Sequence, residues 1–373
     1  MRIGGIPRAI LETIARADRA RFRFHVLCTD REGEWGDALR AQGVPVKLQK
    51  PWPASRPWRM CRFVEEVRRL RPALVHIHNR PAVIPAAVAC RLLGRIPYII
   101  HYHNDLGDYE TLAKPLYRDI ERRLTLPAAA ILSVSVSAAD SNAASLRIPR
   151  GRIRVIYNGV SASSFRDAAP CDPHREWGIS PGRPLVMQAG RLTGFKGPKD
   201  FIAAAAKVLS EWPVAAGAPP AFVLVGDGPD RAECERLVEA MGAQRDIILA
   251  GFREDMPAVL ASAAVGVFAS TGNEGLGQVL MQYIAARLSI AATTIPSVTE
   301  VLRDGVHALL SPPGDPALLA ASIVQLLADR ETARTLAARA DAEVLPLFDW
   351  ARTEHDQEEL YAQILGPPPA PNS

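Results

Sequence analysis

Short apolar runs alternate with longer segments of helical periodicity along the sequence, and this alternation constrains the fold most strongly. The pattern is typical of βαβ units, in which helices connect parallel strands. It predicts strands at residues 22–28, 44–48, 73–78, 98–103, 129–136 and 152–157, and again at 185–189, 221–225, 246–250, 265–268, 289–293 and 308–310. We therefore predict an α/β protein with two doubly wound Rossmann-like domains, whose ligands bind at the carboxyl ends of the strands in the cleft between the domains.

The 373 residues suffice for two domains of ordinary size. A stretch rich in Pro, Asp and Gly separates the two halves and predicts a linker. The predicted boundaries are 1–166 for the first domain, 167–184 for the linker, 185–345 for the second domain, 346–365 for a C-terminal helix and 366–373 for a disordered tail.

The start of the chain leaves out an element that such a domain usually has. Gly4 and Gly5 follow only three residues, so there is no room for the apolar strand that runs into a glycine-rich turn. We expect either that the true start lies upstream or that the sheet of the first domain lacks a strand.

The net charge of +4 is the sum of two unequal parts, because residues 1–170 carry +13 and the remainder carries −9. A basic domain suits an anionic membrane or acceptor. The alternative is a compositional bias toward Arg, and both interpretations stay open. No aromatic-basic repeat accompanies the charge, so we do not expect nucleic acid as a partner.

The cysteines and the hydropathy pattern indicate a cytoplasmic protein. The five cysteines are odd in number and widely scattered, which is typical of reduced thiols rather than of disulfides. No apolar run is long enough to cross a bilayer, and the first residues do not form a signal peptide.

The strongest chemical motif is residues 271–282, which follow a predicted strand with a glycine-rich turn and then a helix. Backbone N–H groups at such a helix start favour an anion. Glu274 would repel a phosphate, so we expect its carboxylate to meet sugar hydroxyls. Gln282 lies two helical turns further on and could reach a ribose. The alternative is an ordinary capping turn.

Two further loops follow predicted strands of the second half. Residues 189–197 carry Arg191 and Lys196 on a turn with three glycines, and two fixed cations suit a diphosphate. Taken alone, this loop could equally be a solvated basic loop. Gly226, in the next loop, would permit a close backbone approach to a ligand, although this signal is weak.

Two strands of the first half end in polar residues. Alternation along each strand places His76 with His78, and His101 with His103, on common faces. We do not expect zinc there, because no Cys or carboxylate cluster completes a tetrahedral set. No Asp-x-Asp pair follows a strand either, so a divalent cation on a diphosphate has no evident ligand.

From Gly4 to about Tyr361 the chain resembles the retaining GT-B glycosyltransferases of family 4, most densely over residues 186–313. Arg191 and Lys196 match the diphosphate-binding pair of that family, and Glu274 matches the first Glu of its Glu-x7-Glu motif. Gly251-Phe252-Arg253 matches the loop near the nucleotide base. In the first half, Gly4-Gly5 resembles the loop that faces the donor phosphates, and His103 aligns with the histidine under the transferred sugar.

The resemblance implies transfer of a sugar from a nucleotide-diphosphate sugar to a glycan, lipid-linked or small-molecule acceptor in cell envelope polysaccharide biosynthesis. It implies no metal or other cofactor, a departing phosphate that takes the acceptor's proton, and a C-terminal helix that returns to the first domain. Gln282 departs from the family, which has a second Glu there, and Gln still offers a hydrogen-bond acceptor. The motifs and the resemblance together give these candidate residues: catalytic His103 and Glu274; donor-binding Gly4, Gly5, Arg191, Lys196, Gly226, Phe252, Arg253, Gly275, Leu276, Gly277 and Gln282; and, on the acceptor side, His78, Asn79 and Arg80.

Two other functions stay open. The departure at Gln282 and the missing strand are also compatible with a catalytically weakened binding protein, and the architecture is shared with nucleotide-sugar epimerases.

Residues 51–63 interleave Trp52, Trp58 and Phe63 with arginines, which suits peripheral docking on the inner face of a cell membrane. The alternative is that these aromatic side chains pack inside the first domain.

Overall fold

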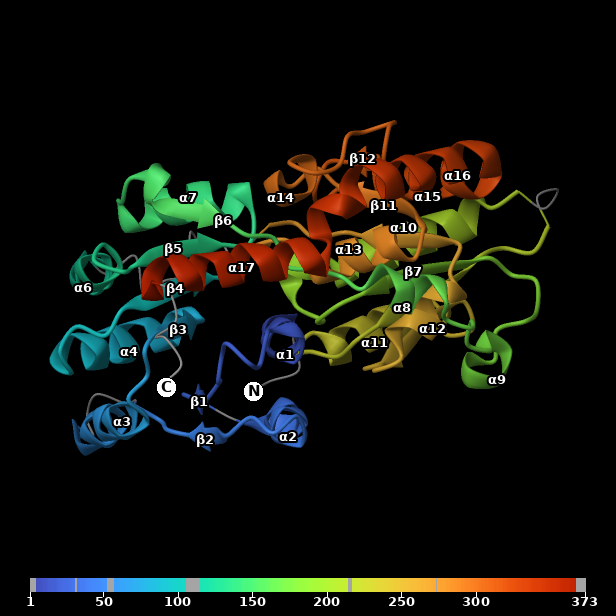
Figure 1. Ribbon diagram of the computed structural model, residues 1–373. Helices are drawn as coiled ribbons and strands as arrows, with labels where there is room; N and C mark the ends of the chain where they lie inside the picture. Colours follow the sequence, from blue (N-terminus) through green and yellow to red (C-terminus); the bar gives the residue numbers. More distant parts are fainter. Residues whose placement is uncertain are drawn as a thin grey trace. The chain divides into compact units, whose positions relative to one another are not determined.

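The computed structural model describes residues 5–30, 32–51, 57–104, 115–213, 217–272 and 274–366. All twelve predicted strands are present, and every strand pair is parallel. The chain forms two compact units (Figure 1). Unit 1 contains Met1–Gly159 and Trp350–Ser373, and unit 2 contains Val160–Asp349.

Unit 1 has two separate parallel sheets, one with the order β1-β2 and one with the order β3-β4-β5-β6. Within the described ranges no strand joins β1 to β3, and both predicted alternatives, a start that lies upstream and a sheet that lacks a strand, are compatible with this. Its elements are α1 (Gly5–Arg16), β1 (Val26–Cys28), α2 (Gly33–Ala41), β2 (Val46–Leu48), α3 (Pro57–Leu70), β3 (Val75–His78), α4 (Arg80–Leu92), β4 (Tyr98–Tyr102), α6 (Pro115–Thr125), β5 (Ala130–Ser133), α7 (Val136–Leu146), β6 (Ile153–Val155) and α17 (Trp350–Leu365).

All six strands of unit 1 are shorter than predicted, and the two largest differences, at β1 and β5, have identifiable reasons. Residues 22–25 precede β1 because Phe22 packs its ring 5.6 Å from the ring of Tyr361 in α17 instead of entering a sheet. β5 ends at Ser133 because the Ser135 hydroxyl accepts the Ala138 N–H and caps the start of α7.

Unit 2 is a six-stranded parallel sheet of order β12-β11-β10-β7-β8-β9 with helices on its faces. Buried side chains from the sheet and from α10, α11, α15 and α16 form its core. Its elements are α8 (Ala162–Arg166), α9 (Pro173–Trp177), β7 (Leu185–Ala189), α10 (Pro198–Glu211), β8 (Ala221–Val225), α11 (Arg231–Ala240), β9 (Ile247–Gly251), α12 (Met256–Ala261), β10 (Val265–Phe268), α13 (Gln278–Ala285), β11 (Ser289–Thr293), α14 (Pro296–Thr299), β12 (Leu309–Ser311), α15 (Pro316–Ala328) and α16 (Arg330–Arg339).

The units divide at Gly159, earlier than the predicted residue 166. Helix α8 already packs on α12 and α13 of unit 2. The predicted linker also contains α9, and the Cys171 N–H donates to the Ala258 carbonyl at 3.0 Å. These contacts make residues 160–184 part of unit 2 rather than a free connection.

The C-terminal helix α17 belongs to unit 1, as Figure 1 shows by its place beside β4 and β5. The Thr353 hydroxyl donates to the Tyr157 carbonyl at 3.0 Å. Leu360 and Tyr361 pack with Ile99 and Leu132 of the sheet. The helix therefore covers the face of the unit 1 sheet to which Ile99 belongs.

Candidate functional site

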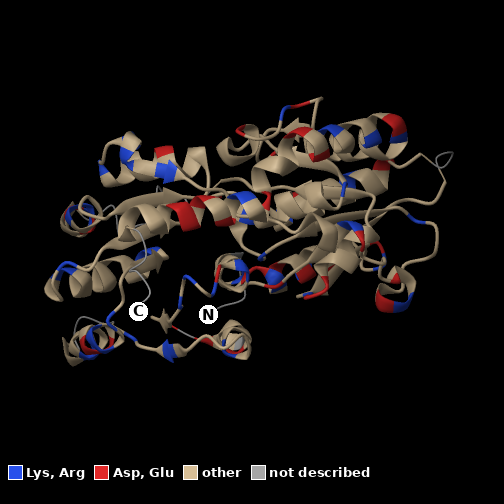
Figure 2. Ribbon diagram, viewed as in Figure 1, with Lys and Arg blue, Asp and Glu red and all other residues tan. Residues whose placement is uncertain are grey.

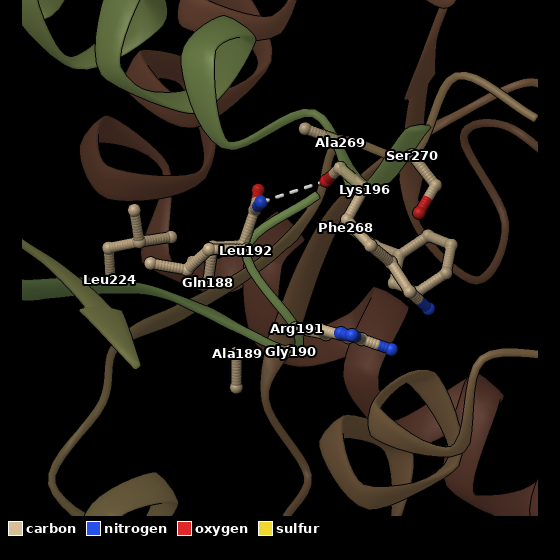
Figure 3. A pocket seen from close by; sticks show the side chains of 10 residues that line it. All are labelled: Gln188, Ala189, Gly190, Arg191, Leu192, Lys196, Leu224, Phe268, Ala269 and Ser270. Atoms are coloured by element: carbon tan, nitrogen blue, oxygen red, sulfur yellow. Dashed lines mark hydrogen bonds between the residues drawn. The ribbon is translucent and has the colours of Figure 1, made fainter. Parts of the chain in front are cut away.

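The loops after β7 and β10 lie together in unit 2 and form a small pocket. The Thr271 N–H donates to the Phe195 carbonyl at 2.8 Å, which joins the two loops directly. The residues that line the pocket in Figure 3 are Gln188, Ala189, Gly190, Arg191, Leu192, Lys196, Leu224, Phe268, Ala269 and Ser270. The loop of Arg191 and Lys196 therefore meets the segment of Glu274.

Lys196 and Glu274 form an ion pair with each other. The Glu274 side chain is 7% exposed and the Lys196 side chain 22%. The Ser270 hydroxyl donates to the same carboxylate at 2.9 Å. The Gln188 amide donates to the Lys196 carbonyl at 3.0 Å, which is the dashed line in Figure 3. A nearly buried carboxylate and its cation therefore stand together where a diphosphate and a sugar were predicted.

Arg191 has a different environment from Lys196. Its side chain is exposed, and among the described residues it forms no ion pair. It lines the same pocket as Lys196. The pocket therefore has one cation that is neutralised by a carboxylate and one cation that is available to an anion.

Gly226 serves a close approach within the protein, where the sequence predicted an approach to a ligand. A Cβ atom at Gly226, whose φ is +135°, would lie 1.9 Å from the Gly190 carbonyl oxygen. The Gly190 N–H donates to the Val225 carbonyl at 2.9 Å. Because it has no side chain, Gly226 allows the loops after β7 and β8 to come into contact. A contact of Gly226 with a nucleotide-sugar donor stays a prediction.

The segment from Gly275 to Gly277 leads into α13. Leu276 is buried, and Gly277 lies so close to the Phe268 ring that a Cβ atom would be 2.4 Å from it. Gln282 is half-buried on α13, while the next residue, Tyr283, donates its hydroxyl to the Val267 carbonyl at 3.2 Å. The helix start is thus fixed against β10, with Gln282 on the less buried side.

Phe252 and Arg253 follow β9 in unit 2. Phe252 is 42% exposed, which is compatible with stacking on a flat ring. Arg253 forms ion pairs with Glu176 and Asp255, and its guanidinium lies 5.7 Å from the Trp177 ring. Hydrogen bonds to Asp255 and Glu176 raise the pKa of Arg253. Contact of this loop with a nucleotide base stays a prediction.

Four histidines share one face of the unit 1 sheet. His78 lies opposite His101 in the β3–β4 register, and His76 and His103 extend the row along the same face. The His78 Nδ1 and His103 Nε2 atoms are 2.9 Å apart, and the His76 Nδ1 is 2.7 Å from the Tyr361 hydroxyl. The predicted common faces are therefore confirmed, and the two pairs form a single cluster.

Burial determines the protonation of this histidine row. Desolvation lowers the pKa of His76, His101 and His103 well below the ordinary value, and it lowers the pKa of His78 to about 4. The imidazole rings are neutral near pH 7 as a result. A neutral His103 can offer hydrogen bonds to a sugar but cannot supply a positive charge.

Asn79 and Arg80 follow His78 directly. Asn79 is exposed and has a φ of +72°, a conformation that non-glycine residues adopt at a cost of about 1–3 kcal/mol. The Arg80 guanidinium is buried and forms an ion pair with Glu121 at 2.9 Å, and Glu121 is fully buried. Arg80 therefore holds α4 to α6, and its contact with an acceptor stays a prediction.

The remaining predictions concern glycines at the N-terminus and aromatic and basic residues on or before α3. Gly4, Trp52 and Arg56 lie outside the described residues, and Gly5 begins α1. Phe63 is buried in the core of unit 1, whereas Trp58 is 54% exposed. The membrane interpretation was therefore wrong for Phe63, because that ring packs beneath its own helix.

Sequence reasoning missed three polar residues that complete these sites. Ser270 orients Glu274, Tyr361 meets His76, and Glu121 pairs with Arg80. Each partner is distant in sequence or lies in an ordinary context, so only the tertiary fold brings it into place. The one available signal was Ser270, a polar residue between the end of β10 and the glycine-rich turn.

Comparisons with known proteins show which families the chain is similar to. The sequence model described as Glycosyltransferase Family 4 matches residues 3–164, and the model described as Glycosyl transferases group 1 matches residues 183–329. The chain is similar to the 2-deoxystreptamine N-acetyl-D-glucosaminyltransferase of Streptomyces fradiae, with 29% identity over 80% of this chain and 73% of that protein. It is also similar to the alpha-D-kanosaminyltransferase of Streptomyces kanamyceticus, with 27% identity over 74% of this chain and 73% of that protein.

The fold has a close structural counterpart. The crystal structure of Anabaena HepE in complex with UDP-glucose matches 97% of this chain and 97% of that chain. The TM-score is 0.83 and the sequence identity is 20%, so this likeness concerns the fold.

Proposed function

Because the chain belongs to the group 1 glycosyltransferases of the GT-B fold, we propose that it transfers a hexose with retention of configuration at the anomeric carbon. The enzyme class is glycosyltransferase, and the donor is a nucleotide sugar. We propose UDP as the nucleotide, because HepE has been crystallised with UDP and with UDP-glucose.

The observation that carries the proposal is that Arg191 and Lys196 line one pocket of unit 2 and that Lys196 pairs with Glu274. A diphosphate that binds Arg191 and Lys196 draws Lys196 from Glu274. The Glu274 carboxylate then accepts hydrogen bonds from the hydroxyls of the sugar, while Ser270 keeps it oriented. The pocket thus has cations for the leaving group and an anion for the sugar.

The chemical step follows from these charges. An acceptor hydroxyl oxygen bonds to the anomeric carbon, the bond from that carbon to the diphosphate oxygen breaks, and the acceptor's proton passes to the departing phosphate. Arg191 and Lys196 stabilise the negative charge that develops on the diphosphate. Two fixed cations at the diphosphate make a divalent metal unnecessary there. For unit 1, we propose that the neutral His103 ring contacts the transferred sugar.

The acceptor is a small polyhydroxylated or aminated molecule in this proposal. The relatives in Streptomyces are named for transfer to 2-deoxystreptamine or for transfer of kanosamine, and another relative is named for transfer to malate. Each of these three names refers to a polar molecule or a sugar, and none refers to a lipid. Glycan and lipid-linked acceptors are the alternatives to such a molecule.

Incubation of the protein with UDP-hexoses, without an acceptor, tests the proposal. A transferase releases UDP slowly by transfer to water, an epimerase produces a new UDP-sugar, and a pure binding protein does neither. Proton NMR of the first-formed hexose reports its anomeric configuration. We expect this configuration to be the same as in the donor. Addition of Mg²⁺ or Mn²⁺ to dialysed protein should leave the rate unchanged.

A cytoplasmic location with a membrane contact of unit 1 is a separate proposal. Helix α3 presents Trp58 and Arg62 to solvent. Figure 2 shows Lys and Arg spread over α1, α3, α4 and α6. Among the described helices, none has both the length and the apolar character needed to span a bilayer. Co-sedimentation with vesicles should require anionic lipid and weaken with salt, and equal recovery with neutral vesicles would refute the electrostatic contact.

A further inference from the structure

The histidine row of unit 1 contains two rings that the proposed transfer does not use, His76 and His101. His101 is 2% exposed, and neither of its ring nitrogens has a hydrogen-bond partner. The Nε2 atom of His76 is also buried and without a partner. Buried polar atoms are nearly always hydrogen-bonded, so several unpartnered nitrogens in one cluster point to a missing ligand.

The geometry of three of these rings fits a metal ion. One ring nitrogen from each of His76, His78 and His101 lies within 4.8 Å of the other two. Ligand nitrogens around a tetrahedral Zn²⁺ are about 3.4 Å apart, because each Zn–N bond is about 2.0–2.1 Å long. Small rotations of the side chains therefore bring the three nitrogens to one ion. The parallel β3–β4 register holds the two strands in the position that this requires.

Two neighbours orient the rings as the outer partners of metal ligands do. The His76 Nδ1 lies 2.7 Å from the Tyr361 hydroxyl, and the His78 Nδ1 lies 2.9 Å from the His103 Nε2. In the tautomers that carry a proton on Nδ1, these bonds leave the Nε2 lone pairs of His76 and His78 available. A second hydrogen bond of this kind accompanies most histidines that bind metals.

We propose that His76, His78 and His101 bind one zinc ion through three imidazole nitrogens, with a water molecule as the fourth ligand. Imidazole ligands suit Zn²⁺, whereas Mg²⁺ and Ca²⁺ require oxygen ligands. The sequence argued against zinc because no cluster of Cys or carboxylate residues completes a tetrahedral set with either His-x-His pair. The parallel register joins the two pairs and makes that further ligand unnecessary. This zinc site does not depend on the proposed transfer reaction.

Metal titration of protein without a polyhistidine tag tests the site. The test uses a Cys61→Ser background, because Cys61 is an exposed thiol that could itself bind zinc. Competition with a chromogenic chelator should show one equivalent of bound Zn²⁺. His76→Gln and His101→Gln should each weaken binding by at least about 100-fold, the upper range for the loss of a supporting group. His355→Gln, an exposed position on α17, is the matched control and should bind as the parent does.

Cobalt provides a second readout in case a glutamine variant fails to fold. Co²⁺ bound to the parent should give the visible absorption of a tetrahedral ion. His76→Cys retains a zinc ligand, so it should keep the metal and add a thiolate-to-cobalt charge-transfer band. The proposal is overturned if the Cys61→Ser protein shows no saturable binding, if folded glutamine variants bind as tightly as the control, or if His76→Cys binds without that band.

Discussion

Replacement of Lys196 by Ala should affect both turnover and stability, because Lys196 is the cation of a nearly buried carboxylate. Glu274 is 7% exposed and accepts hydrogen bonds from Lys196 and from Ser270 at 2.9 Å. After the substitution, Glu274 keeps the hydrogen bond from Ser270 and loses the one from Lys196. The leaving diphosphate also loses one of its two proposed cations, Arg191 being the other.

The magnitudes follow from this burial. Removal of one partner from a fully buried ion pair costs about 3–5 kcal/mol. Lys196 keeps 22% of its exposure and Ser270 remains, so we expect a smaller loss, about 2 kcal/mol. For a unit of this size, that loss lowers Tm by about 4–8 °C. Turnover should fall by about 100- to 1000-fold, as it does when one charge-stabilising donor is removed.

A double variant separates the two effects. Lys196→Ala combined with Glu274→Gln leaves no buried charge, so its Tm should recover most of the loss while turnover stays low. The matched control is Lys199→Ala, which breaks the exposed Lys199–Glu233 pair and should change neither quantity. Thermal unfolding measures the stability of each variant, and the release of UDP measures its turnover. If the double variant loses as much stability as the two single variants added together, the reasoning about this ion pair is wrong.

Three further substitutions test other parts of the account. Gln282→Glu restores the residue that the family usually has there, so donor affinity measured by calorimetry should be kept or raised, and a collapse would indicate a different contact. Gly226→Ala places a Cβ atom 1.9 Å from the Gly190 carbonyl oxygen, so thermal unfolding should show a loss of about 1–3 kcal/mol, and unchanged stability would contradict the loop contact. Glu66→Gln should destabilise at pH 7, because a hydrogen bond from Lys47 lowers the pKa of Glu66 below its ordinary 4.5. In denaturant unfolding this difference should vanish as pH falls through the lowered value, and a difference that persists would refute the pair.

Much of the fold could be predicted because parallel strands buried on both faces leave continuous apolar runs. β7 and β8, for example, are buried throughout, and their predicted bounds, 185–189 and 221–225, agree with the structure. The predicted ends of strands were wrong where a side chain stabilises another structure in place of the strand. Ser135 caps a helix within a run that is otherwise β-like.

The sequence predicted which residues belong to the candidate site, but it did not predict which of them form ion pairs with one another. The positions of Arg191, Lys196 and Glu274 follow from strand, turn and helix signals in the local sequence. The ion pair between Lys196 and Glu274 joins residues 78 positions apart, and no local pattern carries that information. Arg80 likewise resembles a surface residue at a strand end, and only the fold reveals the fully buried Glu121 opposite it.

Calorimetric titration of UDP into Arg191→Ala, compared with the unsubstituted protein, tests the central claim most directly. Arg191 is exposed and has no ion pair among the described residues, so its loss should leave the fold unchanged. We predict that UDP binds the unsubstituted protein and that Arg191→Ala weakens this binding by about 10- to 100-fold, the worth of a charge-assisted hydrogen bond. Equal UDP affinity in the two folded proteins would contradict the placement of the diphosphate at this pocket.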